Sequence, residues 1–561
     1  MRTPTVPAFL AALAVTLASA LAPPPAPAQA RPAAPAPARH PAGQAAQPGA
    51  RQAQTRAQRL PASAPRLVVV ITVDQMRADY LERFRGQFTG GLARLLRTGA
   101  WFTDAYLDNA MTETAVGHAT ILAGRNPASH GIIRNSEGAN DPGAPLIEGR
   151  GSGASPLRFR GTTLFDWLQA RSPDSRMLSV SRKDRGAILP VGRAMQLVFW
   201  FADGGFTTSD YYADTLPTWV RAFNARGVAA RSAGRAWEPL LPADSYPEPD
   251  VAPWEHGGTD IAFPHRMPVD SASARRVFIA MPWMDELTLD FALEGVRQAG
   301  IGRGPAPDVL AISLSSTDAV GHTYGPHSRE IHDQMLRLDR SLGTFLDSLA
   351  KLRDPRRTVV VLTADHGITP FTGWSRRNGF PLADVVSVDS IVQAAYNALF
   401  RLVGPGRWIR YFDLGLLTMD RAGLVARGVN VDSVVGALAT AIRAVHGVLR
   451  VDTPRSLAAV DTAQGAVGRR WLNTVPAGVG AELMVTLRPR FVFGGANSAE
   501  HGQPSDDDTH VALLFWGGGI RPGTYTGRVS VVDIAPTLAV LLDVQPTEPI
   551  QGRVLTEALR R

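Results

Sequence analysis

The chain has 561 residues, 45% of them hydrophobic, with 58 Lys and Arg residues against 50 Asp and Glu residues. This length and apolar content suffice for one large α/β domain with insertions, or for two domains. Cysteine is absent, which excludes disulfide bonds and thiolate metal sites. Any metal ligands must therefore be oxygen and nitrogen atoms.

The excess positive charge lies in the N-terminal segment. Residues 1–64 contain six arginines and no acidic residue, whereas the rest of the chain has 52 basic against 50 acidic residues. A nearly neutral folded part gives no reason to expect nucleic-acid binding. We therefore expect no nucleic-acid partner.

The first 65 residues differ in composition from the remainder. An early arginine, an apolar stretch and a small-residue ending predict a secretory signal peptide over residues 1–30. A membrane anchor is less favoured, because the apolar run is short for a bilayer and three prolines follow it. Residues 31–65, mostly Ala, Pro, Gln and Arg, predict a disordered tether. We expect a periplasmic or secreted protein without a stable transmembrane segment after signal removal, and a folded domain over residues 66–561.

From residue 66 onward, apolar runs of strand length alternate with helical patterns. This alternation predicts an α/β fold with a mostly parallel central sheet flanked by helices. In chain order, we expect a buried strand at 67–73, a helix at 115–123, an amphipathic helix at 163–170, a short strand at 177–181, a long helix at 329–352 and an apolar helix at 531–542.

Two stretches fit this alternation poorly. Residues near 192–290 are rich in Trp, Tyr, Pro and Gly, and residues near 371–500 contain helix candidates at 391–402 and 434–445. We expect both to be cap insertions that form the wall or lid of a pocket over one edge of the sheet. An independent second domain remains the alternative.

Acidic and histidine side chains stand next to the predicted strands. Six of them, in four short segments, are Asp74, Asp318, His322, Asp365, His366 and His510. The first three segments lie at or just beyond the end of an apolar run, and the fourth precedes one. Carboxylate and imidazole groups held at strand ends suit a divalent cation, because the backbone keeps each ligand still. One such residue alone is more often a helix cap, but the set of six favours metal binding.

A hydroxyl nucleophile is available in Met111-Thr-Glu-Thr114, just before a predicted helix. Backbone amides and the helix dipole at such a start favour phosphoryl oxygens. Thr112, two residues earlier, is the alternative nucleophile. We expect His118 and His130 to be structural, hydrogen-bonding the turns around the nucleophile.

Five short motifs occur in the order of a known family. They are Gly-His-Ala-Thr-Ile at 117–121, Pro127 with His-Gly-Ile at 130–132, Ser-Ser-Thr-Asp at 315–318 followed by Gly-His at 321–322, Asp-His-Gly at 365–367, and Asp-Asp-Thr-His-Val at 507–511. From residue 66 to near its C-terminus the chain resembles the alkaline phosphatase superfamily. The resemblance is to the periplasmic, phosphate-irrepressible alkaline phosphatases, which are related to type I phosphodiesterases and nucleotide pyrophosphatases.

The resemblance implies two zinc ions. It assigns Asp318, His322 and His510 to one ion, and Asp74, Asp365 and His366 with the oxygen of Thr114 to the other. Two cations roughly 4 Å apart can clamp the attacking and the leaving oxygen of an in-line displacement. We therefore expect a metal-dependent phosphoric monoester hydrolase with a phosphothreonine intermediate on Thr114, and one carboxylate among Asp506 to Asp508 orienting His510.

The substrate class depends on the groups that meet the phosphoryl oxygens. The chain has only two lysines, Lys183 and Lys351. In the family, the counterparts of Lys183 and Arg185 bind phosphoryl oxygens in the monoesterase branch, and Asn135 adds an amide donor. An ammonium and a guanidinium match the dianionic phosphoryl group of a monoester, so we expect small-molecule phosphate monoesters.

The segment after the nucleophile departs from the family pattern. The branch often has Pro directly before the Gly-His that follows the nucleophile, whereas this chain has Ala115 and Val116 before Gly117.

Two alternative functions remain. They are a phosphodiesterase or nucleotide pyrophosphatase on the same fold, and a non-catalytic metal-binding surface protein. Asp and His ligands also suit divalent ions other than zinc.

Overall fold

The structure is a computed structural model that describes residues 64–461, 465–476, 478–494 and 499–560. The expected signal peptide lies outside the described residues, and so does the expected tether apart from residues 64 and 65. The described residues form one compact unit. Within the described ranges, every helix is too short or too polar to span a bilayer.

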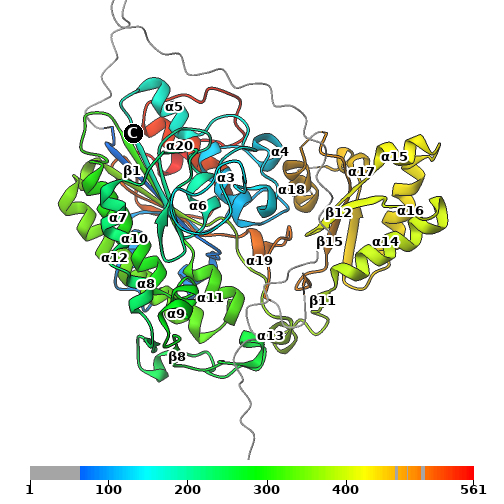
Figure 1. The fold of residues 1–561 in the computed structure, drawn as a ribbon, viewed down its shortest axis with the longest axis horizontal. Coiled ribbons are helices and arrows are strands. Elements are labelled where there is room, and N and C mark those ends of the chain that lie inside the picture. Colours follow the sequence, from blue (N-terminus) through cyan, green and yellow to red (C-terminus); the bar gives the residue numbers. More distant parts are fainter. Residues whose placement is uncertain (1–63, 462–464, 477, 495–498, 561) are drawn as a thin grey trace, which may run out of the picture. The chain divides into compact units, whose positions relative to one another are not determined.

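The centre of the described part is a sheet of nine strands in the order β18-β2-β17-β10-β1-β9-β4-β5-β6 (Figure 1). The strands are β1 (Leu67–Val73), β2 (Ala100–Phe102), β4 (Met177–Ser181), β5 (Leu197–Ala202), β6 (Gly205–Thr207), β9 (Asp308–Leu314), β10 (Thr358–Thr363), β17 (Leu513–Gly517) and β18 (Gly523–Tyr525). The inner strands β10, β1, β9, β4 and β5 are parallel, whereas β17 and β6 are antiparallel to their neighbours. The expected mostly parallel α/β sheet is confirmed.

Helices cover both faces of this sheet (Figure 1). One group contains α2 (Gly91–Thr98), α10 (Trp283–Gln298) and α12 (Arg329–Leu352), and the other α3 (Thr114–Ala123), α5 (Leu164–Arg171), α6 (Asp184–Ile188) and α20 (Ile534–Leu541). Strand β1 is a run of β-branched and aliphatic residues buried along its whole length, as expected for a strand covered on both sides. The helices expected at 115–123, 163–170 and 329–352 are present within one residue.

The stretch near 192–290 is not an insertion throughout, which corrects the sequence interpretation. Strands β5 and β6 extend the central sheet at one edge, and α10 packs on β4 and β9. The aromatic run in β5 is almost wholly buried, because it pairs in parallel with β4. Along the chain between β6 and α10 lie α7 (Thr218–Asn224), α8 (Val228–Arg231), β7 (Ala236–Trp237), β8 (His265–Arg266) and α9 (Ser271–Phe278).

A second, antiparallel sheet lies within the stretch near 371–500, and we call residues 388–487 the second-sheet lobe. Its strands are β12 (Ile409–Asp413), β13 (Leu416–Met419), β15 (Ala481–Leu487) and β14 (Val448–Asp452), in that order. Helices α14 (Val388–Val403) and α16 (Val431–Arg443) pack together and share an apolar core with this sheet. The lobe also contains α15 (Arg421–Ala426), α17 (Pro454–Ala458) and α18 (Ala466–Thr474).

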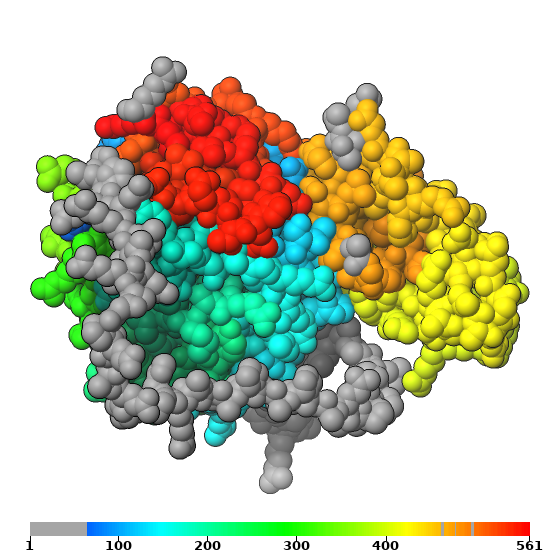
Figure 2. All heavy atoms as spheres, turned by 90° about the horizontal axis from the view of Figure 1, so that it is seen from above, coloured from blue at the N-terminus to red at the C-terminus, as the bar shows by residue number. Residues whose placement is uncertain are grey.

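The lobe contacts the segment that leads to α3. Met111 and Ile133 share a small apolar cluster with Leu416, Trp471 and Met484 of the lobe. In Figure 2 the yellow and orange surface of the lobe borders the cyan surface of the main body. The lobe therefore packs against the segment that precedes α3.

Short elements complete the described part. They are α1 (Asp79–Arg83), β3 (Ala105–Tyr106), α4 (Pro127–His130), α11 (Ser316–Tyr324), α13 (Thr372–Arg377), β11 (Val385–Val386), β16 (Val492–Phe493), α19 (Asp506–Thr509) and β19 (Val529–Ser530). The apolar helix expected at 531–542 is a 3₁₀ turn, Val531–Asp533, followed by α20.

Candidate active site

The candidate residues meet where the central parallel strands end. Strand β1 lies between β9 and β10, so the three carboxyl ends share one edge of the sheet. Asp74 follows β1, Asp318 lies in α11 after β9, and Asp365 and His366 follow β10. The amide of Asp74 donates to Leu314 O at 2.8 Å. Four predicted ligand residues, far apart in sequence, are thereby brought together.

One group of potential ligands contains Asp74, Asp318 and His366, whose ligand atoms all lie within 4.8 Å of one another. His366 Nε2 is 3.4 Å from Asp74 Oδ1 and 3.7 Å from Asp365 Oδ2. Asp74, Asp365 and His366 are fully buried. Asp74 Oδ1 accepts no hydrogen bond among the described residues, while Asp74 Oδ2 lies 2.6 Å from Lys183 Nζ and Asp365 Oδ2 lies 3.0 Å from His118 Nδ1. A cluster of buried carboxylates is costly unless positive charge compensates it, so this group fits a divalent cation.

A second group contains Asp318, His322 and His501. Asp318 Oδ1 lies 3.4 Å from His322 Nε2 and 3.9 Å from His501 Nε2. The ring of His501 also stacks on that of His366, with 3.7 Å between centroids. Because Asp318 belongs to both groups, the two candidate cation positions are adjacent.

His510 is not part of this second group, which corrects the sequence interpretation. Its Nε2 donates to Thr103 O at 2.8 Å, and its ring stacks on Tyr106 at 4.5 Å. His510 and Tyr106 also form an isolated antiparallel bridge just before β17 begins. The edge of the sheet is the expected one, but this pairing directs the imidazole to Tyr106. His501, in Glu-His501-Gly, stands beside Asp318 instead, and sequence reasoning missed it.

The three site histidines share one hydrogen-bonding pattern. Each donates its Nδ1 proton to a backbone carbonyl: His366 to Gly367 at 2.9 Å, His322 to Ala499 at 3.0 Å and His501 to Thr112 at 2.6 Å. The Nε2 lone pairs therefore face the carboxylates. Metal-binding histidines are characteristically fixed in this way, and an oxygen-and-nitrogen donor set suits zinc and similar divalent ions.

Thr114 is the first residue of α3 and is almost fully buried. Its Oγ1 lies 3.2 Å from Lys183 Nζ and 3.5 Å from His366 Nε2. The alternative, Thr112, donates its hydroxyl to Gln503 O and accepts from the Gly502 amide. Thr112 therefore orders a loop, whereas the hydroxyl of Thr114 faces the two groups of potential ligands.

Lys183 lies between the carboxylates, just after β4 at the start of α6. Its Nζ is 2.6 Å from Asp74 Oδ2 and 2.8 Å from Asp318 Oδ2. Burial, together with Asp318 and Asp365, raises the pKa of Asp74, and Lys183 opposes this shift. The pKa of Asp318 stays well below its usual value despite burial, because Lys183 and His322 are close. The positive charge of Lys183 therefore favours the ionised form of both carboxylates.

Asn135 and Arg185 flank the start of α3. Asn135 Oδ1 accepts from the backbone amide of Ala115 at 2.9 Å, and the backbone amide of Asn135 donates to Glu113 Oε2 at 2.8 Å. Arg185 Nη1 is 3.6 Å from Asp184 Oδ1, and its buried Nε has no hydrogen-bond partner among the described residues. Helix α6, which carries Arg185, packs against α3.

Two further residues support the site. His118 donates to Thr114 O at 2.9 Å and lies 3.0 Å from Asp365 Oδ2, in keeping with a structural role next to the nucleophile. Asp508 accepts from the Gln503 amide and the Thr369 hydroxyl. The expected orienting carboxylate of the Asp506–Asp508 run thus supports the loop of His501, not His510.

The chain resembles known proteins over most of its length. Residues 68–406 match the family model of type I phosphodiesterase / nucleotide pyrophosphatase. The chain is 31% identical to alkaline phosphatase PhoV of Synechococcus elongatus, covering 88% of this chain and 93% of that protein. It is 30% identical to alkaline phosphatase PafA of Elizabethkingia meningoseptica, covering 89% and 95%.

Solved structures give the same result. The crystal structure of wild-type alkaline phosphatase PafA superposes with a TM-score of 0.83 at 29% identity, covering 89% of this chain and all of that chain. A PafA variant with a threonine, an asparagine, a lysine and an arginine replaced also gives 0.83, at 28% identity.

The sheet, its strand-end carboxylates and histidines, and these relatives define a metal-dependent hydrolase of phosphoric esters. The chain belongs to the type I phosphodiesterase / nucleotide pyrophosphatase family, within the alkaline phosphatase superfamily.

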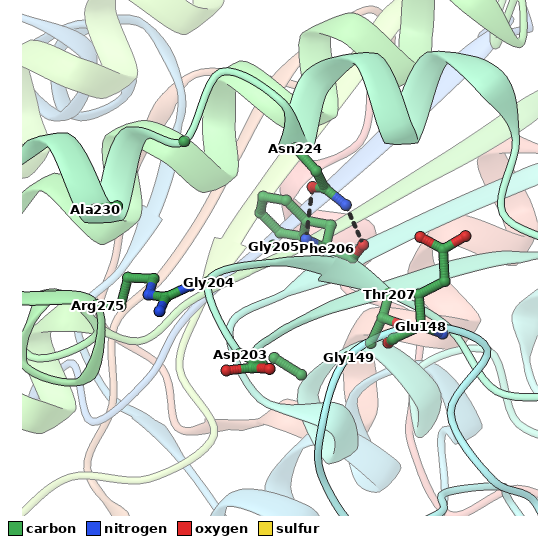
Figure 3. Close-up of a pocket in the computed structure, with 12 residues that line it drawn as sticks. Glu148, Gly149, Asp203, Gly204, Gly205, Phe206, Thr207, Asn224, Ala230 and Arg275 are labelled. Carbon is green, nitrogen blue, oxygen red and sulfur yellow. Dashed lines mark hydrogen bonds between the residues drawn. The ribbon is translucent and has the colours of Figure 1, made fainter. Parts of the chain in front are cut away.

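A separate cavity of about 290 Å³ lies at the outer edge of the sheet, around the β5–β6 hairpin (Figure 3). Glu148, Asp203, Asn224 and Arg275 contribute to its wall. The side chain of Asn224 is occupied by hydrogen bonds to the backbone of Phe206. None of the candidate site residues lines this cavity.

Proposed function

We propose that this chain is a two-zinc alkaline phosphatase that hydrolyses small phosphate monoesters through a phosphothreonine on Thr114. The observation that carries the proposal is the position of the Thr114 hydroxyl. It lies within 3.5 Å of Lys183 Nζ and His366 Nε2, beside two adjacent groups of potential ligands. A binding protein would not need a hydroxyl group at this point.

The donor sets support two cation positions. One would be held by Asp74, Asp365 and His366 with the oxygen of Thr114, and the other by Asp318, His322 and His501. When bound, the pair of cations would lower the pKa of the threonine hydroxyl and offset charge on the attacking and leaving oxygens. His501 takes the role that the sequence assigned to His510.

The remaining residues act on the substrate. Thr114 Oγ1 forms the bond to phosphorus as the bond to the leaving oxygen breaks, and water then cleaves the phosphothreonine to release inorganic phosphate. Lys183 and Arg185 neutralise the phosphoryl oxygens, and Asn135, with its Oδ1 already engaged by Ala115, presents its amide group. Thr114 is almost fully buried, which limits the contact of its hydroxyl with bulk water.

The PafA variant supports these roles. It replaces a threonine and an asparagine 21 positions apart, and a lysine and an arginine two positions apart. Thr114 and Asn135 have the same separation of 21, and Lys183 and Arg185 the same separation of two. These four residues are therefore the ones we assign to the nucleophile and the phosphoryl-binding groups.

The proposal is tested by comparing a monoester and a diester with the same leaving group. We expect the monoester to have the higher kcat/KM, and activity to disappear on chelation and return with zinc. Thr114→Ala should abolish turnover while leaving zinc binding measurable, because three protein ligands remain at each position. A clear preference for the diester would favour the phosphodiesterase alternative, which the family description supports.

Lys183→Ala is expected to lower monoester turnover much more than diester turnover, because only the monoester carries a dianionic phosphoryl group. A loss of about 10²-fold is typical when one charged group aimed at the reacting oxygens is removed. The readout is the ratio of the two kcat/KM values. Lys351→Ala, on the exposed end of α12, is the matched control and should leave that ratio unchanged. Equal losses on both substrates for Lys183→Ala would contradict its assigned role.

We also propose export to the periplasm or the medium. The sequence of residues 1–30, with its arginine, apolar stretch and small-residue ending, supports a cleaved signal peptide. N-terminal sequencing of the secreted protein would test it, and a mature protein that still begins at Met1 would contradict it.

A further inference from the structure

Gln75 lies between the two candidate cation positions, although sequence reasoning did not single it out. It directly follows Asp74 and is fully buried. Its φ of 69° is in the left-handed region, which is disfavoured for residues other than glycine. A buried glutamine held in this conformation requires specific contacts to keep it there.

Those contacts run to one carboxylate on each side. The backbone amide of Gln75 donates to Asp365 Oδ1 at 3.1 Å, and its side-chain Nε2 donates to Asp318 Oδ1, also at 3.1 Å. The left-handed backbone allows the amide to face Asp365 while the side chain reaches Asp318. Gln75 is thus the residue whose two donors join the two carboxylates.

These hydrogen bonds set the rotation of both carboxylates. With Oδ1 of Asp318 held, its Oδ2 faces Lys183 at 2.8 Å, and Oδ1 keeps a second lone pair on the side of His322. With Oδ1 of Asp365 held, its Oδ2 faces His366 Nε2 at 3.7 Å. Hydrogen bonds to ligating carboxylates are a general means of orienting metal ligands.

Gly321 makes room for the glutamine. A Cβ at this position would lie 1.8 Å from Gln75 Oε1. Gly321 stands on α11 directly before His322. The glycine of the Gly-His motif therefore opens the path by which the Gln75 side chain reaches Asp318.

We propose that Gln75 is a positioning residue of the metal centre, whose side chain orients Asp318 and whose backbone amide orients Asp365. The inference rests on the proposed function, because it takes the two carboxylates to be cation ligands. Its consequence is asymmetric. Changing the side chain disturbs only the cation held with His322 and His501, since the backbone amide remains.

The test is a zinc titration of chelator-stripped Gln75→Met protein against a chromophoric competitor. Methionine has a similar length but no donor, and it leaves the backbone amide in place. One of the two zinc ions should bind about 10- to 100-fold more weakly, the range typical for loss of an orienting hydrogen bond, and the other should be unchanged. Gln393→Met, on the exposed surface of α14, is the matched control.

Two backgrounds identify the affected ion. In His366→Ala protein, the cation position that keeps all of its protein ligands is the one with Asp318. Adding Gln75→Met should weaken zinc binding there. In His501→Ala protein the remaining site contains Asp365, and adding Gln75→Met should have no effect. Gly321→Ala should reproduce the selective loss, because its Cβ displaces the side chain of Gln75.

The zinc stoichiometry distinguishes a failure of the proposed function from a failure of the role proposed for Gln75. Wild-type protein that binds fewer than two zinc ions contradicts the proposed function. Wild-type protein that binds two, with Gln75→Met binding both normally or losing both equally, overturns the role of Gln75. Circular dichroism checks the fold of each variant. If Gln75→Met does not fold, Gln75→Gly replaces it, because glycine accepts the left-handed backbone and also lacks the donor.

Discussion

Backbone carbonyls determine which nitrogen of each site histidine faces the carboxylates. His322, His366 and His501 each donate from Nδ1 to a carbonyl and so direct Nε2 inward. His510 instead uses Nε2 for Thr103 O, so that nitrogen does not face the carboxylates. At the scale of single residues, the role of a histidine depends on its hydrogen-bond partner.

Replacing His501 and replacing His510 by alanine should therefore have different effects on zinc binding. His501→Ala should weaken zinc binding at one position by at least about 100-fold, more than the loss of an orienting partner. His510→Ala should retain both zinc ions and lose roughly 1–3 kcal/mol of stability, because Thr103 O loses its donor. Zinc titration and unfolding by denaturant measure the two effects. Zinc lost in His510→Ala but retained in His501→Ala would contradict the assignment.

His130 illustrates a buried histidine with a structural role. Its Nδ1 accepts from the Ile132 amide at 3.2 Å, and its Nε2 lies 3.1 Å from Thr120 Oγ1. Burial, with Arg125 nearby, lowers the pKa of His130 to about 3. A second proton on Nδ1 would face the Ile132 amide, so the neutral ring is the form that fits the fold.

This shift predicts a pH dependence of stability. The unfolded chain protonates His130 below its ordinary pKa of about 6.5, whereas the folded chain does not until about pH 3. Stability is therefore lost as pH falls below 6.5, by about 2 kcal/mol at pH 5. His130→Gln should remove that part of the loss between pH 7 and 5, measured by denaturant unfolding. His446→Gln, at an exposed ring, should not; an equal effect in both variants would contradict the explanation.

At the scale of elements, α3 carries Thr114 and must approach the loop after β10 closely. Gly117, one turn into α3, makes this possible, because a Cβ there would lie 2.1 Å from Asp365 O. The clash is with backbone atoms, which cannot turn away like a flexible side chain. Gly117 therefore sets the distance between the nucleophile helix and two potential ligands, Asp365 and His366.

Gly117→Ala should cost about 1–3 kcal/mol of stability by overpacking, and should lower kcat/KM because α3 moves away from His366. Gly436→Ala on α16 is the control, since nothing lies within 4 Å of a Cβ there. Alanine at an open helical position should stabilise by about 0.5–1 kcal/mol. Unfolding free energies and kinetics are the readouts. Unchanged stability and activity in Gly117→Ala would contradict the close-approach argument.

At the scale of the described unit, the acidic centre joins parts of the chain that are otherwise far apart. Asp74, Asp318 and Asp365 are all buried, and burial together with repulsion from Asp318 and Asp365 raises the pKa of Asp74. A fold with such a centre is more stable when cations occupy it, because binding only the folded state stabilises that state.

Zinc removal is therefore expected to lower the thermal midpoint. At free zinc about 100 times Kd, each site contributes about 2.7 kcal/mol, which corresponds to about 5 °C for two sites in a unit of this size. Differential scanning calorimetry with and without chelator measures the shift. The double variant His366→Ala, His501→Ala should show little shift. A chelator effect of the same size in that variant would locate the stabilising ions elsewhere.

The sequence determined the sheet and most of the site. The apolar run at 67–73 predicted β1, and the apolar runs before Asp318 and Asp365 correspond to β9 and β10. Residues that follow neighbouring parallel strands share one edge of the sheet. This pattern brings Asp74, Asp318, Asp365 and His366 to one edge of the sheet. His322, Thr114 and Lys183, expected from the resemblance to the alkaline phosphatase superfamily, lie beside that edge. Strand patterns and short motifs are local, and a single sequence contains them.

Only the tertiary structure decided between His501 and His510, and only it revealed Gln75. The two histidines are nine positions apart in one short segment. Which one reaches Asp318 depends on Thr369 pairing with Glu500 and on Asp508 holding Gln503. The contacts of Gln75 likewise depend on a left-handed backbone and on the space left by Gly321. The contacts of Gln75 with Asp365 and Asp318 span 290 and 243 residues, and no local pattern encodes them.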